Sequence, residues 1–187
     1  MRGHSIRHPP SKPSTDAWAV FQCSCYLYSA SGMLVNQSGA WRFVISIPVV
    51  GATLLVGGEI ARKLAVRKHK VAGLVRGGSA HPKAQQLQSA GIEITAGDLC
   101  RPETLIPALK NSETVVCTAT SMPYATDHGL QKLDHDGTLA LIEVAKRQGV
   151  KKFVCVSYSG NICEECRLET AKRECESRLL ASQTESE

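Results

Sequence analysis

The sequence predicts an α/β fold built on a doubly wound parallel sheet. Three observations lead to this prediction. From residue 43 onward, short apolar runs alternate with segments of helical periodicity. The first apolar run leads into a glycine-bearing turn and then a helix, over residues 49–60. Such alternation is typical of parallel sheets with right-handed crossover connections.

The expected strands are short, apolar runs. In the first of them, Pro48 cannot donate a hydrogen bond to a neighbouring strand, so two extents stay open for it, residues 44–52 and residues 48–52. The five expected strands span residues 44–52, 71–75, 92–96, 114–119 and 152–157.

The segments between these strands have helical spacing. Ile60 and Leu64 share one face of the first helix, Pro102 suits the first turn of the third, and Gly149 ends the longest. The expected helices span residues 57–68, 82–90, 102–109, 127–148 and 168–181.

Composition argues against a nucleic-acid partner. The 187 residues are 43% hydrophobic and 21% charged, as in an ordinary globular domain. The net charge is +5, but the basic residues are scattered and aromatic residues make up only 5%, whereas nucleic-acid surfaces usually carry a basic stripe with stacking platforms. The densest basic group lies at residues 63–70, where we expect the solvated end of a helix.

The cysteines and histidines predict neither a disulfide framework nor a metal site. Cys163, Cys166 and Cys175 have partial zinc-ligand spacing, but no second pair of ligands follows, and a reducing compartment is expected. His128 and His135 are two helical turns apart, too far to share one ion without further ligands, so we expect a solvated helix face there, with Asp134 and Asp136 beside His135.

Residues 1–47 differ from the rest of the chain and are expected to be a poorly ordered extension or not part of the core. They are rich in serine and proline, and their only acidic residue is Asp16. Residues 17–35 are too polar for a membrane span. A cytoplasmic location is expected, with an organelle as the alternative because this composition resembles a transit peptide.

The region 49–182 resembles atypical short-chain dehydrogenases/reductases of the NmrA-like, isoflavone-reductase-like group. The resemblance is carried by residues 51–57, 74–76, 97–99 and 153–157, together with the long helix between them. It implies that residues 48–187 form a Rossmann-like NAD(P)-binding domain. The family continues with a carboxyl-terminal region that forms much of the substrate pocket, and this sequence is expected to lack it.

The turn after the first strand is the expected pyrophosphate site. Unpaired amides at a helix N-terminus stabilise a phosphate, and small residues let the backbone approach closely. Leu54 stands where the family has a glycine: its side chain either obstructs the pyrophosphate or points away from an ordinary backbone. The expected contacts from this turn are Gly51, Thr53, Leu54, Leu55, Val56 and Gly57.

The remaining cofactor contacts favour NADP over NAD. Arg76 at the end of the second strand suits a 2′-phosphate, and Lys83 adds a second cation; the alternative for Arg76 is a solvated strand end. The resemblance implies that Asp98 and Leu99 contact the adenine. Two residues at strand ends complete the expected set, Thr118 and Ser157.

The expected catalytic residues are Lys172 and Tyr158. Related reductases pair a tyrosine with a lysine four residues later, but Leu168 stands four residues before Lys172. Lys172 either assists chemistry, only holds the cofactor, or is a surface residue, and Tyr158 is either a substitute proton donor or a structural residue.

Three functions therefore stay open. The first is an NADP-dependent oxidoreductase core that transfers hydride to or from a small organic substrate, with the cofactor supplying the chemistry. The second is a non-catalytic NAD(P) sensor or protein-interaction module. The third is a degenerate fold with weak nucleotide binding.

Overall fold

A computed structural model describes residues 45–122, 126–157 and 166–184, and three short strands before them. The chain divides into two compact units, residues 1–42 and 43–187. The short strands are β1 (Leu27–Tyr28), β2 (Met33–Val35) and β3 (Trp41–Phe43), and β1 pairs with β2 in antiparallel orientation. The expected division of the chain at residue 47 stays a prediction.

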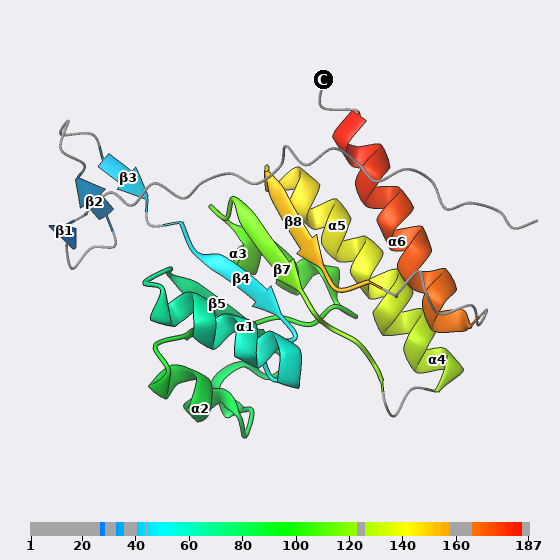
Figure 1. Ribbon diagram of the computed structural model, residues 1–187, viewed down its shortest axis with the longest axis horizontal. Helices are drawn as coiled ribbons and strands as arrows, with labels where there is room; N and C mark the ends of the chain where they lie inside the picture. Colours follow the sequence, from blue (N-terminus) through cyan, green and yellow to red (C-terminus); the bar gives the residue numbers. More distant parts are fainter. Residues whose placement is uncertain are drawn as a thin grey trace, which may run out of the picture. The chain divides into compact units, whose positions relative to one another are not determined.

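The second unit is built on a five-stranded parallel sheet with the strand order β6-β5-β4-β7-β8 (Figure 1). Its central strand comes first in the chain, and the order reverses beside it, which confirms the doubly wound α/β fold. The strands are β4 (Ile47–Val50), β5 (Val71–Val75), β6 (Glu93–Ala96), β7 (Thr114–Cys117) and β8 (Lys152–Cys155).

The central strand includes Pro48 and spans only Ile47–Val50, so neither expected extent, 44–52 or 48–52, matches it. The amide of Ile47 donates to Lys70 O on the β5 side, and the alternation of the backbone turns the Pro48 nitrogen toward β7. Pairing with β7 begins only at Val49. The missing proline donor therefore breaks no ladder hydrogen bond.

Helices cover both faces of the sheet (Figure 1). Val49 packs with Ala61 and Leu87 on one face, whereas Val50 packs with Leu105 and other residues on the opposite face. The α-helices are α1 (Leu55–Val66), α2 (Ala84–Ser89), α3 (Leu105–Leu109), α4 (Asp127–Gly129), α5 (Thr138–Arg147) and α6 (Arg167–Thr184). Short 3₁₀ turns are η1 (Gly78–Ala80) and η2 (Pro102–Thr104).

The long helix expected at residues 127–148 is present, but its middle is not α-helical. A π-helix, η3 (Leu130–Gly137), joins α4 to α5. Such wider turns are rare in proteins, and where they occur they often lie at functional sites. This one packs against α6 and buries Asp134 completely, although the sequence predicted a solvated face for this residue.

Candidate dinucleotide site

The turn between β4 and α1 is closely packed and lies at the point where the strand order reverses. Gly51 has φ +86°, a conformation that favours glycine. A Cβ on Gly57 would lie 2.3 Å from both Gly51 O and Thr118 Oγ1, so only glycine fits. Thr118 Oγ1 donates to Val50 O (3.1 Å), which fixes the floor of this turn from β7.

Leu54 has an ordinary backbone. Its φ of −88° and ψ of 163° are those of extended chain, and it is the N-cap residue of α1. Its amide donates to Gly51 O (2.9 Å) and its carbonyl accepts from Gly58 N (2.8 Å). The turn therefore forms without the positive φ that a leucine would resist.

The N-terminus of α1 has the features that an anion requires. No side chain caps it, and its first turn contains no acidic residue. Leu55 is 86% exposed and Val56 is 52% exposed, so their side chains point away from the packed turn. The uncapped amides and the helix dipole are available to a phosphate.

Lys83 reaches this turn from the segment after β5. Its Nζ donates to Thr53 O (2.8 Å), and its amide donates to His81 Nδ1 (3.1 Å). Arg76 is exposed and directly follows β5, the neighbour of β4 in the sheet. Of the two expected cations, Lys83 therefore contacts the glycine turn, and Arg76 lies at the end of β5, the strand beside β4.

The side chains of Asp98 and Leu99 are already engaged. Asp98 Oδ1 accepts from Cys100 N (3.0 Å), and Oδ2 pairs with Arg101 Nε (3.5 Å). The Leu99 side chain is buried in the core and leaves its backbone for any ligand contact. Their contact with adenine stays a prediction.

Lys172 is not a surface residue. It is 12% exposed on α6, and its Nζ lies 3.1 Å from Asp134 Oδ1 and donates to Ala119 O (3.4 Å), just beyond β7. Asp134 is completely buried, so the expected solvated face was wrong for this residue. Asp134 lies on the same buried face as Thr138 and Leu141, where an apolar side chain rather than a carboxylate would be expected.

The Asp134 carboxylate is stabilised in its charged form. Its Oδ2 accepts from the Ser121 amide (2.9 Å) and the Ser121 hydroxyl (2.5 Å), and Oδ1 faces the Lys172 charge. Burial would raise the pKa of Asp134, but the Ser121 hydrogen bonds and Lys172 outweigh it and hold the pKa below its ordinary value. A buried ion pair therefore fixes Lys172 near the carboxyl end of β7.

Ser157 and three thiols share a small cavity with Lys172. Burial raises the pKa of both Cys117 and Cys175 to about 11, so these thiols stay neutral. Burial also raises the pKa of Cys155. The structure thus brings Ser157 and Lys172 together, whereas Tyr158 lies outside the described residues.

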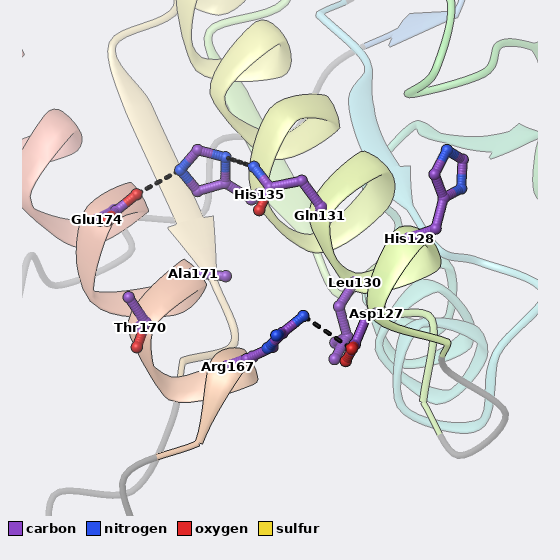
Figure 2. Close-up of a pocket in the computed structure, with 9 residues that line it drawn as sticks. All are labelled: Asp127, His128, Leu130, Gln131, His135, Arg167, Thr170, Ala171 and Glu174. Atoms are coloured by element: carbon purple, nitrogen blue, oxygen red, sulfur yellow. Dashed lines mark hydrogen bonds and ion pairs between the residues drawn. The ribbon is translucent and has the colours of Figure 1, made fainter.

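A polar groove of about 620 Å³ lies between α4–η3 and α6 (Figure 2). Ion pairs bridge it at Asp127–Arg167 and at His135–Glu174. Sequence reasoning missed this groove, because it depends on how α6 packs. In the described part of the chain, no group of three or more histidine, cysteine or acidic residues could hold a metal ion, and no helix is long and apolar enough to cross a membrane.

The fold and the glycine turn define a dinucleotide-binding α/β protein. The profile of the NAD(P)H-binding family matches residues 51–174, and the chain belongs to this family. Its relatives and structural neighbours confirm the resemblance to atypical short-chain dehydrogenases/reductases.

Two relatives and one solved structure illustrate the similarity. The chain is 39% identical over 110 residues to the photosystem II assembly factor Ycf39 of Synechocystis, covering 58% of this chain and 32% of the relative. It is 35% identical over 108 residues to the NAD(P)H azoreductase of Xenophilus azovorans, covering 58% and 34%. The chain thus spans about a third of the length of these relatives.

The solved structure is the triphenylmethane reductase of Citrobacter, which is complexed with NADP(H). Its TM-score is 0.60 at 22% identity, and the alignment covers 73% of this chain and 46% of the reductase. This likeness supports the fold.

Proposed function

We propose that this chain is the NADP(H)-binding core of an oxidoreductase that transfers hydride to or from a small organic substrate. The observation that carries the proposal is the glycine turn, where Gly51 and Gly57 let the backbone pack closely and the helix N-terminus that follows is not capped by a side chain. The pyrophosphate would be held by the amides of residues 55–57, because these donors start the helix, whereas the Leu54 amide is bonded to Gly51 O.

Lys83 and Arg76 favour NADP over NAD in this proposal. A 2′-phosphate carries added negative charge, and both cations flank the region between the turn after β4 and the end of β5. The triphenylmethane reductase structure, of similar fold, contains NADP(H). Asp98 and Leu99 would border the adenine.

Lys172 would hold the nicotinamide end. Its buried pairing with Asp134 holds it at the carboxyl end of β7, beside Ser157. The bound cofactor supplies the hydride. Lys172 orients it, and Tyr158 or Ser157 would provide a hydroxyl for proton transfer.

A non-catalytic dinucleotide-responsive module is the second candidate. Leu168 occupies the position of the tyrosine found in related reductases, and a relative is described as a photosystem II assembly factor. An organelle is favoured over the cytoplasm as the location, because another relative, 35% identical over 120 residues, is named as a chloroplastic protein of Arabidopsis thaliana. Imaging of a fluorescent fusion of the full chain tests the location.

Calorimetric titration with NADPH and NADH tests the cofactor proposal. NADPH is expected to bind about tenfold more tightly than NADH, and Arg76→Asp is expected to reverse the order. Arg147→Asp, on the exposed part of α5, is the matched control and should leave the order unchanged. No binding of either nucleotide would refute the proposal. NADPH oxidation with azo or quinone acceptors then separates the reductase from the non-catalytic module.

A further inference from the structure

His135 lies between two carboxylates that belong to different helices. Its Nε2 contacts Glu174 of α6, and its Nδ1 lies 2.6 Å from Asp136 Oδ1 on η3. Gln131 Nε2 donates to the same Asp136 oxygen (2.9 Å) and also lies 2.9 Å from His135 Nδ1. Figure 2 shows the imidazole directed across the groove at Glu174. The side chain is only 18% exposed.

The protonated imidazole matches this geometry better than the neutral one. A neutral ring has a single N–H and can donate to one carboxylate, whereas the imidazolium donates to both. The hydrogen bond to Asp136 and then the bond to Glu174 outweigh burial and raise the pKa of His135 above its ordinary value. The contact between η3 and α6 is therefore strongest when the ring is charged.

This contact adjoins the ion pair of Lys172. Asp134 and His135 are consecutive in η3, and their partners Lys172 and Glu174 are two residues apart in α6. Cys175 Sγ donates to Asp134 O (3.7 Å) between them. Because α6 is one helix, a loss of the His135–Glu174 pair weakens the docking of the segment that carries Lys172.

We propose that His135 and Glu174 are positioning residues for Lys172 and that they make dinucleotide affinity depend on pH. The inference rests on the proposed role of Lys172 in holding the dinucleotide. Below the folded-state pKa of His135 the imidazolium joins η3 to α6. As the pH rises through that raised pKa, Nδ1 loses its proton and accepts from Gln131, so the Nε2–Glu174 hydrogen bond loses the charge that strengthens it, α6 is held less firmly, and affinity falls.

The other charged groups around His135 are few in the described residues. In the groove, α4 contributes Asp127 and His128, and α6 contributes Arg167, which pairs with Asp127. On α5, Glu143 pairs with Arg178 of α6. His128 lines the same groove, so it offers a matched histidine control.

The experiment compares NADPH affinity at about pH 6 and about pH 9 by calorimetry in the wild type, His135→Gln and His128→Gln. The wild type and His128→Gln are expected to lose about fivefold more affinity over this range than His135→Gln. His135→Lys keeps a charge at both pH values and is expected to rescue affinity at the higher one. The proposal would be refuted if the pH dependence of NADPH affinity were the same in His135→Gln and the wild type. It would also be refuted if His128→Gln abolished that pH dependence.

Hydrogen exchange of the α6 amides, corrected for intrinsic rates, separates this inference from the proposed function. If NADPH binds at neither pH, the cofactor proposal fails, but the contact can still be tested. Protection of α6 that falls with pH in the wild type and not in His135→Gln supports the positioning pair. Protection that is the same in both proteins overturns it.

Discussion

The glycine turn and the η3–α6 contact lie at the carboxyl ends of neighbouring strands, yet they are built by different forces. At the turn after β4, backbone atoms lie so close that a single methyl group has no room. At the contact of η3 with α6, buried charges hold two helices together through the Asp134–Lys172 pair. Steric packing makes the turn insensitive to pH, whereas the helix contact responds to protonation.

The comparison divides the proposed site into a rigid half, the glycine turn, and an electrostatic half, the contact of η3 with α6. The half that would hold the pyrophosphate depends on backbone shape, and it tolerates Leu54 because the backbone there is ordinary. The half that would hold the nicotinamide depends on charges carried by α6. We therefore expect substitutions in the turn to act through exclusion of volume, and those in η3 and α6 through electrostatics.

Gly57→Ala is the strongest test of the steric half. The new Cβ would lie 2.3 Å from the Gly51 carbonyl oxygen, and a backbone atom cannot move aside cheaply. We expect a loss of about 3 kcal/mol or more in the free energy of unfolding, measured with urea, and loss of NADPH binding. Gly149→Ala is the control: its φ is +73° but nothing lies within 4 Å, so about 1 kcal/mol is expected. Equal losses in the free energy of unfolding for Gly57→Ala and Gly149→Ala would contradict the steric explanation.

Asp134→Asn tests the electrostatic half. It leaves the Lys172 ammonium without a counter-charge in a largely buried place, and we expect a loss of about 3 kcal/mol in the free energy of unfolding near neutral pH. Glu113→Gln, which breaks an exposed pair with Lys151, should cost less than about 0.5 kcal/mol.

The stability difference between the wild type and Asp134→Asn is expected to depend on pH. The hydrogen bonds and charge that outweigh burial lower the pKa of Asp134 in the folded state. Its contribution is therefore present above the unfolded carboxyl pKa of about 4 and is lost as the pH falls through the folded value. The difference between wild type and Asp134→Asn should shrink in acid. A difference that stays constant would show that the carboxylate charge is not what stabilises the contact.

Lys83→Met should have a smaller effect, confined to one nucleotide. It removes the contact with Thr53 O and one cation beside the proposed 2′-phosphate. Calorimetry is expected to show about fivefold weaker NADPH binding and little change for NADH. Lys63→Met, on an exposed face of α1, is the control. An equal loss of affinity for both nucleotides would show that Lys83 supports the shape of the turn and does not contact the 2′-phosphate.

Leu54→Gly should have the smallest effect, because the backbone at this position is extended and needs no glycine. We expect NADPH affinity to change by less than about twofold. Leu54→Ala separates removal of the side chain from added backbone freedom. A large gain in affinity with both variants would show that the leucine side chain obstructs the site.

Local patterns were enough to predict the parallel sheet, the glycine turn and the order of the helices. Apolar runs and helical spacing act over a few residues, and the right-handed crossover leaves few ways to connect them. Pro48 left the start of the first strand open, because its effect depends on where β7 begins to pair, which the local sequence does not show. Asp134 was expected to be solvated because carboxylates are rarely buried, and its buried partner Lys172 lies on a helix distant in the sequence.

The sequence by itself determined that a closely packed glycine turn follows the first strand, because Gly51 and Gly57 act through their own missing side chains. The tertiary structure alone decided that Lys172 is buried and paired, that Lys83 reaches Thr53, and that His135 joins two helices. These contacts connect residues about 30 to 40 positions apart. The stabilising interactions form only between groups that the packing of the helices brings together, so residue spacing along the chain does not predict them.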